Sequence, residues 1–364
     1  MNLALALKAR GHEVLFACSP LPFDAVDALE KRARERGLEP VTRFRLAKHF
    51  SLRDNFADAR DLPPWLKAQG IEIVHCHRRQ DHWVAGRAAR RCGIPVVRSL
   101  HDGTPLAGTL RDRWLTARAT DRLLYASAAA KACDQTRHSW AEGFALTLPP
   151  AVDLDRYSPQ GLGNLRAELG IPEGAVVIGI AARVQEKRRF DLLLGAFQRV
   201  LASLPEIRLL IIGRGTRLDE VARKPAERLG ISHRLVFAGY RREDYRQALN
   251  TMDFQIFLVP GSDGSCRALR EALALGKPAV TTRRGMIPEI VHDGDNGVSA
   301  DETVESLAAA LVRLGSDAGL RSRMGAAARQ RALREYALTL QAERTEAVYR
   351  DLGLVSTTPP PSRA

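Results

Sequence analysis

The sequence predicts an α/β protein of two domains, each built on a parallel β-sheet that helices cover on both faces. Short apolar runs of strand length alternate with helical patterns along most of the chain, and this alternation is typical of parallel sheets. The chain has 364 residues, enough for two cores of ordinary size. A segment with three prolines and no periodicity, residues 148–159, follows the first series of elements and predicts the connection between the domains.

The first series begins with a helix over residues 3–9, which ends at Gly11. The elements expected next are a strand at 12–18, a helix near 25–36, a strand near 40–46, a helix near 62–69, a strand at 71–77, a helix at 83–91, and strands at 95–101 and 122–127. In such sheets the ligand site lies beyond the carboxyl ends of the strands. The strands at 71–77 and 95–101 end there in His77 and His101.

Histidines at these strand ends have three possible roles. His75 and His77 share one face of their strand because side chains alternate. A zinc site of His75, His77, Asp81 and His82 has suitable ligand types, but its spacing matches no usual motif, so we expect no metal. A packed structural role for His75, or a role at the ligand site, remains open.

The second series begins with a strand at 176–181, which leads into the sequence ARVQEKRRFDLLLGAF. Its cations Arg183, Lys187 and Arg188 lie between a strand and a helix, where phosphate groups bind in nucleotide-binding sheets. A second strand, 207–213, ends in Gly213, Arg214 and Gly215, which lack the third glycine of a dinucleotide fingerprint. Further strands at 235–239 and 254–259, a partial helix at 245–249, and helices at 304–314 and 320–349, interrupted near 336, complete the domain.

A loop after Pro260 combines small residues with acidic ones. Asp263, Gly264 and Ser265 precede a helical pattern that contains Glu271. Free backbone N–H groups at a helix start bind anions, whereas a carboxylate suits vicinal hydroxyl groups. A nucleotide sugar carries both kinds of group. The plainer alternative is that Asp263 caps the helix and that Glu271 is a solvated helix residue.

The run from residue 263 to 297 resembles the signature of retaining glycosyltransferases of glycosyltransferase family 4, the group 1 family. The matching residues, in order, are Asp263, Gly264, Glu271, Ala272, Gly276, Lys277, Pro278, residues 285–291, Gly294, Asn296 and Gly297. The family usually has Glu where this chain has Asp263. The connection at 148–159 and the segment from Arg183 to Asp191 are also similar to the family's pattern. In the latter, counting from Arg183 puts Arg188 at the family's Lys position, while Lys187 lies one residue earlier.

The resemblance implies the GT-B fold, in which two Rossmann-like domains with parallel sheets face each other across a cleft. It implies transfer of a sugar from a nucleotide sugar, with retention of configuration and without a metal or other cofactor. Arg183 with Lys187 or Arg188 would stabilise the leaving diphosphate, Asp263 would position the sugar and Glu271 the ribose. The other implied donor-binding residues are Gly213, Gly264, Ser265, Tyr240 and Arg241. His77 and His101 would face the acceptor and the transferred sugar.

The resemblance also implies domain boundaries. We expect an acceptor-side domain at 1–152, a nucleotide-sugar domain at 153–336, a helix at 337–353 that crosses back to the first domain, and a disordered tail at 354–364. In the family a strand and a glycine-rich loop precede the first helix found here. We therefore expect either that the first strand of the amino-terminal sheet is missing or that Met1 is internal to the reading frame.

The charge and composition of the chain limit the classes of binding partner that we expect. The net charge is +13 and the aromatic content is 6%, and the basic residues are dispersed without a nucleic-acid motif, so we expect no nucleic-acid partner. An anionic membrane surface or a solvated basic surface remains possible. Five scattered cysteines, no spanning apolar run and no signal peptide predict the cytoplasm. We expect a glycan or lipid-linked acceptor, as in polysaccharide or lipopolysaccharide synthesis. The alternatives are an inactive or nucleotide-sugar-binding relative and a GT-B epimerase.

Overall fold

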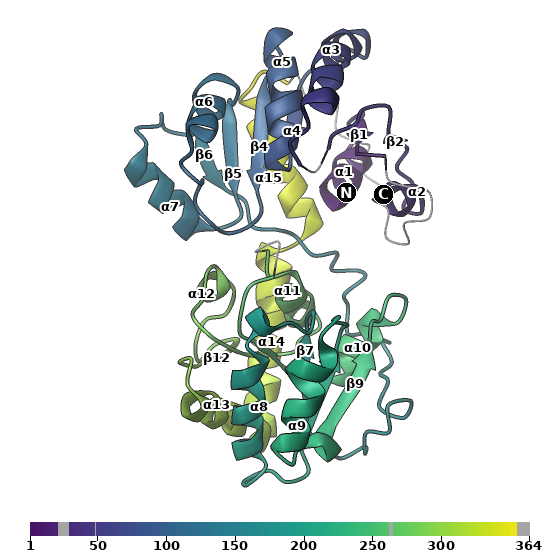
Figure 1. The fold of residues 1–364 in the computed structure, drawn as a ribbon, viewed down its shortest axis with the longest axis vertical. Coiled ribbons are helices and arrows are strands. Elements are labelled where there is room, and N and C mark those ends of the chain that lie inside the picture. The colour runs from purple at the N-terminus through teal and green to yellow at the C-terminus, as the bar shows by residue number, and fades with distance from the viewer. Residues whose placement is uncertain (21–28, 48, 262–264, 355–364) are drawn as a thin grey trace, which may run out of the picture. The chain divides into compact units, whose positions relative to one another are not determined.

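The computed structural model describes residues 1–20, 29–47, 49–261 and 265–354. They form two compact units (Figure 1). Unit 1 is Met1–Ala151 together with the chain from Leu338 onward, and unit 2 is Val152–Ala337. Both units are α/β and all their sheets are parallel, which confirms the predicted fold class. No helix among the described residues is both long and apolar enough to span a bilayer.

The strands of unit 1 form two separate sheets. β1 (Phe16–Ala17) pairs with β2 (Pro40–Val41). The second sheet has the order β3-β4-β5-β6, from Val74–Cys76, Val96–Leu100, Arg122–Tyr125 and Ala145–Thr147. Within the described residues, no strand pairs with both β1 and β3. Because β4 and β5 are inner strands of their sheet, their side chains are almost all buried.

The helices of unit 1 include one from the far end of the chain. They are α1 (Asn2–Ala9), α2 (Leu29–Arg34), α3 (Leu52–Ala68), α4 (Arg79–Asp81), the π-helix η1 (His82–Gly86), α5 (Arg87–Arg91), α6 (Leu110–Arg118), α7 (Ala128–Arg137) and α15 (Leu338–Arg350). Figure 1 shows α15, in yellow, among the purple and blue elements of this unit. Its residues Ala342, Val348 and Tyr349 pack with Leu7 of α1 and Val97 of β4 in one apolar cluster.

One predicted helix begins ten residues too late. We expected it at 62–69, but α3 starts at Leu52 and continues through Pro63 and Pro64. The hydroxyl of Ser51 caps its first turn by accepting a hydrogen bond from the Asp54 N–H, at 3.3 Å. The helix continues through the prolines because Leu62 and Leu66, on either side of them, are buried in the core.

Unit 2 contains a six-stranded sheet of order β12-β11-β10-β7-β8-β9. In chain order its strands are β7 (Val177–Ala181), β8 (Arg208–Ile212), β9 (Leu235–Gly239), β10 (Phe254–Phe257), β11 (Ala279–Thr281) and β12 (Gly297–Ser299). The central strands β7 and β10 lie side by side, Phe254 opposite Ile178. The loops that follow neighbouring strands therefore meet at one edge of this sheet.

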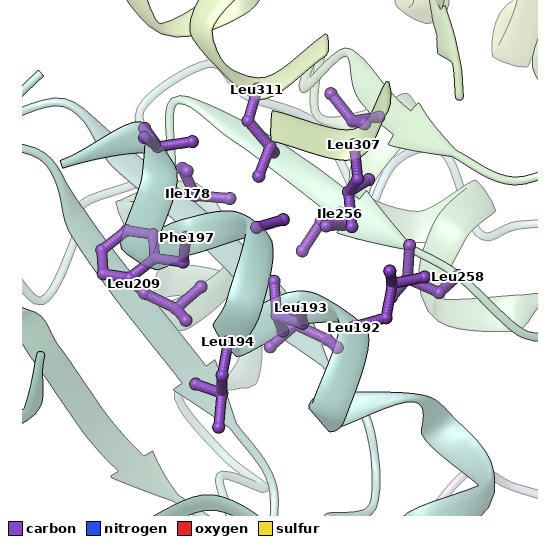
Figure 2. Close-up of a cluster of buried hydrophobic side chains, with 14 of the residues drawn as sticks. Ile178, Leu192, Leu193, Leu194, Phe197, Leu209, Ile256, Leu258, Leu307 and Leu311 are labelled. Carbon is purple, nitrogen blue, oxygen red and sulfur yellow. The ribbon is translucent and has the colours of Figure 1, made fainter. Parts of the chain in front are cut away.

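The helices of unit 2 precede or follow the strands of this sheet. They are η2 (Glu186–Arg188), α8 (Phe190–Val200), η3 (Asp219–Arg223), α9 (Lys224–Arg228), η4 (Ser232–Arg234), α10 (Tyr245–Thr251), α11 (Arg267–Ala274), α12 (Ile287–Ile290), α13 (Val304–Ser316) and α14 (Ala318–Glu335). The longer ones, such as α8 and α13, bury apolar faces in the core of the unit. Figure 2 shows Leu193 and Phe197 of α8 pointing into the same core as Ile178 and Ile256 of the central strands. This packing fixes the start of α8, and with it the loop after β7.

Candidate functional site

The predicted donor-binding residues of unit 2 come from four loops at the same edge of the sheet. Arg183 follows β7, Gly213 follows β8, Tyr240 and Arg241 follow β9, and the loop after β10 leads to α11. All four strands are parallel, so these loops leave the sheet at its carboxyl edge. Asp263 and Gly264 of the last loop lie outside the described residues.

Backbone hydrogen bonds join the loops after β7 and β8. The Ala182 N–H donates to the Ile212 carbonyl at 3.0 Å, and the Val184 N–H donates to the Arg214 carbonyl at 3.1 Å. A Cβ atom at Gly213 or Gly215 would lie far inside van der Waals contact with the carbonyl of residue 182 or 184, respectively. The two glycines therefore permit this close approach. They hold Arg183 next to the end of β8.

The three predicted cations differ in their surroundings. Arg183 and Lys187 are exposed, whereas only 8% of Arg188 is exposed. One terminal nitrogen of Arg188, Nη1, donates to the Val259 carbonyl at 3.0 Å and to the Pro260 carbonyl at 2.6 Å. Arg188 therefore holds the loop after β10, and Lys187 presents its charge to solvent.

The end of β9 provides an aromatic ring. Tyr240 is 52% exposed, and the guanidinium carbon of Arg214 lies 4.4 Å from its ring centroid, a cation–π distance. The neighbouring Arg241 has other partners: its Nε donates to the Ala238 carbonyl at 2.7 Å, and it forms ion pairs of 2.7 Å with Asp244 and Glu168. Tyr240 is thus available for stacking, while Arg241 fastens the loop after β9.

Glu271 is a buried carboxylate at this edge, with 4% of its surface exposed. The Nε of Arg267, one turn earlier in α11, donates to Glu271 Oε1 at 2.7 Å. The phenols of Tyr157 and Tyr245 also interact with the Glu271 carboxylate. Burial and this carboxylate raise the pKa of both tyrosines, so both stay protonated and can donate. The plainer prediction, a solvated helix residue, is wrong for Glu271.

Ser265 marks the described start of the segment leading to α11. Its carbonyl accepts a hydrogen bond from Nη1 of Arg270, whose side chain is buried and lies over the Tyr336 ring, 5.2 Å from the centroid. Burial lowers the pKa of Arg270, while the neighbouring Tyr336 acts in the opposite direction. Arg270 thus connects the backbone at Ser265, in the segment that leads to α11, with Tyr336 at the end of α14.

The histidines of unit 1 separate into two groups. His75 is bonded at both ring nitrogens, Nδ1 to the Tyr349 hydroxyl at 2.6 Å and Nε2 to the Ser99 hydroxyl at 2.8 Å. Burial lowers its pKa to about 3. This neutral imidazole ties β3 to β4 and α15, which favours the structural role over the ligand-site role.

His77 and His101 meet at the carboxyl ends of β3 and β4. Their Nδ1 and Nε2 atoms are 3.0 Å apart, and both side chains are exposed. Desolvation and the neighbouring imidazoles of His75 and His101 lower the pKa of His77. These two histidines form the exposed polar group at the edge of this sheet.

The proposed zinc ligands have other contacts. His82 is fully buried and accepts a hydrogen bond from Arg98 Nη1 at 2.9 Å, and Asp81 pairs with Arg78 at 2.7 Å. In the described part of the chain, no three His, Cys, Asp or Glu side chains lie close enough together to hold a metal ion.

Four residues of the unit 2 site were not predicted: Tyr157, Arg214, Tyr245 and Arg267. Arg267 had a local signal, because it lies four residues before Glu271 in a helical pattern. Tyr157 and Tyr245 had none, since they approach Glu271 from segments far away in the sequence. Their position depends on tertiary packing.

Two family models match the chain. The model described as Glycosyltransferase Family 4 matches residues 1–156, and the model of Glycosyl transferases group 1 matches residues 163–331. They divide the chain near the boundary between the two units at Val152. Both halves of the chain therefore point to the same family.

Relatives with assigned activities are similar over part of their length. A D-inositol 3-phosphate glycosyltransferase of Streptomyces avermitilis is 30% identical over 295 residues, 72% of this chain and 61% of the relative. A GDP-mannose-dependent monoacylated alpha-(1-6)-phosphatidylinositol monomannoside mannosyltransferase of Corynebacterium glutamicum is 29% identical over 209 residues, 54% of each chain. The chain thus spans less than two thirds of the length of these relatives.

A solved structure shares the fold. HepE of Anabaena, crystallised in complex with UDP, superimposes with a TM-score of 0.79 at 17% identity, and the match covers 96% of each chain. Together with the two family models, this likeness agrees with the parallel sheets of both units. The chain belongs to the group 1 glycosyltransferases of glycosyltransferase family 4 and has the GT-B fold.

Proposed function

We propose that the chain transfers a sugar from a nucleotide-sugar donor to a hydroxyl group of a glycan or glycolipid acceptor, with retention of configuration and without a bound metal. The observation that carries the proposal is the grouping at one edge of the unit 2 sheet: exposed cations, an exposed aromatic ring and a buried carboxylate. These are the chemical types that a diphosphate, a base and a ribose require.

The chemistry follows from the charges. When the bond between the anomeric carbon and the phosphate oxygen breaks, negative charge develops on the diphosphate. Arg183 and Lys187 would stabilise that charge, and the backbone hydrogen bonds on either side of Arg183 hold its main chain beside the end of β8. The acceptor oxygen would bond to the anomeric carbon on the face that the diphosphate leaves, and its proton would pass to the departing phosphate oxygen.

The remaining roles concern binding. Glu271 would accept hydrogen bonds from the ribose, with Tyr157, Tyr245 and Arg267 fixing its carboxylate. Tyr240 would stack on the base, and Asp263 would position the sugar. Arg188 would hold the loop after β10. His77 and His101 would contact the acceptor or the transferred sugar. The relatives support nucleotide-linked donors of either base, because one uses GDP-mannose and the HepE structure contains UDP.

The test is a turnover assay with the purified chain. UDP-, GDP- and ADP-sugars are supplied with and without lipid or glycan acceptors, and release of the nucleoside diphosphate is measured for the wild-type chain and for Arg183→Ala. We expect one donor to be consumed only when an acceptor is present, and the variant to be at least a hundredfold slower. Conversion of the donor without an acceptor would indicate an epimerase. Nucleotide binding with no turnover for any pair would indicate a binding relative.

A further inference from the structure

Exposed apolar side chains collect at the beginnings of two helices of unit 1. Phe50, Leu52 and Phe56 lie at or just before the first turns of α3, and Leu110 and Trp114 lie at the start of α6. Leu52 is 77% exposed, Phe56 73% and Leu110 84%. The other large apolar side chains that are exposed among the described residues, Tyr240 and Leu333, belong to unit 2. We call the five residues of unit 1 the apolar rim: Phe50, Leu52, Phe56, Leu110 and Trp114.

The start of α3 has the reverse of the usual burial pattern. Here the helix buries Asn55 and Asp58 and exposes the apolar residues at 52 and 56. The carboxylate of Asp58 accepts hydrogen bonds from the N–H groups of Arg45 and Leu46, at 2.9 and 2.8 Å. Rotating the helix to bury its apolar residues would break these bonds and expose their partners. The exposure is therefore built into the fold.

The start of α6 shows the same reversal. It buries Asp112, whose carboxylate pairs with Arg79 at 2.7 Å, and it exposes Leu110 and Trp114. The hydroxyl of Thr109 caps the helix and also hydrogen-bonds to Asp112 at 2.8 Å. The polar inner face is thus satisfied. On the outer face Leu110 is 84% exposed, and Trp114 stays 47% exposed although it packs edge-on against the Trp83 ring and beneath Arg87.

A buried glutamine joins the two helices beneath the apolar rim. Gln80 of α4 donates to Asn55 Oδ1 at 3.1 Å and accepts from Arg111 Nη2 at 2.9 Å. Asn55 precedes Phe56 in α3, and Arg111 follows Leu110 in α6. In Figure 1, α4 lies between these helices. The exposed apolar residues of α3 and α6 therefore lie on either side of one hydrogen-bonded group, formed by Gln80, Asn55 and Arg111.

Arginines accompany the apolar rim. Arg53 lies beside Leu52, and Arg113 and Arg118 lie on the exposed side of α6. None of these three forms an ion pair with a carboxylate in the part of the chain that the structure describes. The whole chain carries a net charge of +13. The apolar rim and its arginines are therefore complementary to a partner that has an apolar interior beneath an anionic surface.

We propose that the apolar rim docks on an anionic lipid bilayer, with its apolar side chains among the acyl chains and Arg53, Arg113 and Arg118 at the headgroups. Helix faces that combine Leu, Phe and Trp with arginine bind at this interface, and anionic lipids attract each added cation. This proposal rests on the proposed function, in which the acceptor of the transferred sugar is linked to a lipid. Docking would bring that acceptor to unit 1 without removing it from the membrane.

The test is co-sedimentation of the full-length chain with vesicles. Vesicles of phosphatidylcholine with 30% phosphatidylglycerol, roughly the anionic fraction that creates a useful surface potential, are compared with phosphatidylcholine alone. The variants are Leu52→Ser with Phe56→Ser, and Leu110→Ser with Trp114→Ser. Leu333→Ser, at the exposed apolar residue of α14 in unit 2, is the matched control. Circular dichroism and thermal melting show that each variant folds.

We expect binding to the anionic vesicles, at least tenfold weaker in each double variant and unchanged in Leu333→Ser. Arg53→Gln with Arg113→Gln is expected to abolish the preference for anionic lipid. Wild-type affinity in both Ser variants, or no vesicle binding by the wild-type chain, would overturn the proposal. Light scattering that shows a dimer which Phe56→Ser dissociates would assign the surface to a second copy instead. Nucleotide stabilisation is measured on the same samples, so a failure of docking is distinguishable from a failure of donor binding.

Discussion

The guanidinium carbon of Arg214 lies 4.4 Å from the centroid of the Tyr240 ring. The two residues follow neighbouring strands, β8 and β9, and the Gly213 N–H donates to the Gly239 carbonyl at 2.8 Å just before them. The backbone therefore holds the pair in register. One face of the ring is covered by a cation, and the ring as a whole is half exposed. The exposed ring is what gives this edge of unit 2 a place for a planar base.

Replacing this ring should weaken nucleotide binding without affecting the fold. Stacking between a base and an aromatic side chain contributes about 1–3 kcal/mol, so we expect Tyr240→Ala to raise the dissociation constant of the donor nucleotide roughly tenfold or more. Tyr240→Phe keeps the ring and should bind like the wild-type chain. Calorimetric titration measures both. Equal affinity of the Ala variant would remove Tyr240 from the site.

The glycines after β8 offer a test that leaves every charge in place. In Gly215→Ala the new methyl group would collide with the carbonyl of Val184, so the loop that carries Arg183 has to move. We expect donor binding to weaken at least tenfold, because phosphate contacts depend on position. Gly163→Ala is the control, since a Cβ atom there meets open space. Unchanged affinity in Gly215→Ala would show that the loop geometry does not matter.

Substitutions of Lys187 and of Arg188 should have different effects on donor affinity and on stability. Lys187 is exposed, so Lys187→Met should weaken donor binding and leave the melting temperature of unit 2 unchanged. Arg188 holds the Val259 and Pro260 carbonyls, so Arg188→Met leaves two carbonyls without their donor and should lower both stability and affinity. A loss of about 1–3 kcal/mol of stability is typical for such groups. Calorimetry is the method of choice.

The opposite pattern, a stability loss only in Lys187→Met, would contradict these assignments. Arg188→Lys adds a further check, because a lysine keeps the charge but cannot donate in the fixed geometry of a guanidinium. We expect it to restore part of the affinity and little of the stability.

The sequence was informative where local pattern and structure agree. The inner strands β4, β5, β7, β8 and β10 were found because buried parallel strands are continuous apolar runs, as at β8 and β10. The cations after β7 and the carboxylate of Glu271 were found because their positions follow from strand and helix ends. The roles proposed for these residues come from the family resemblance.

Two helices were missed or shortened for one physical reason. The first turns of α3 and α6 place apolar residues outward and polar ones inward, so the usual amphipathic pattern gives no signal there. β6 (Ala145–Thr147) was missed because it is only three residues long. Arg189, at φ +58°, occupies a left-handed conformation that normally indicates glycine, so no residue preference marked this helix start.

Long-range contacts explain the rest of the site. Arg188 meets a carbonyl 71 residues away, and Tyr157 approaches Glu271 from the connection between the units. Sequence spacing does not encode such pairs. The assignment of Arg188 to the loop after β10, and of Lys187 to the exposed position, therefore required the structure.

A buried histidine predicts how unit 1 responds to acid. Arg98 donates to Nδ1 of His82, so the ring proton lies on Nε2, next to the Ala119 carbonyl at 3.2 Å. Burial, with a contribution from Arg98, lowers the pKa of His82 to about 3. The unfolded chain takes up this proton near pH 6.5 and the folded chain does not. The stability is full above that pH and falls by up to about 1.4 kcal/mol per unit between pH 6.5 and 3.

Urea unfolding at several pH values checks this expectation. All four tryptophans, Trp65, Trp83, Trp114 and Trp140, belong to unit 1, so their fluorescence follows that unit alone. His82→Gln retains an acceptor and a donor and should flatten the pH dependence, leaving the part due to His75 and His77. His233→Gln, at an exposed position of unit 2, is the control. An unchanged slope in His82→Gln would show that this imidazole does not resist protonation.

Calorimetric titration of the donor nucleotide is the most direct test of the central claim, that the carboxyl edge of the unit 2 sheet binds a nucleotide sugar. UDP, GDP and ADP are titrated into the wild-type chain, and the one that binds is then titrated into Arg183→Ala and Glu271→Ala. We expect one nucleotide to bind with micromolar affinity, about −8 kcal/mol, and each variant to bind it at least thirtyfold more weakly. Wild-type affinity in both variants, or no binding of any nucleotide to the wild-type chain, would contradict the account.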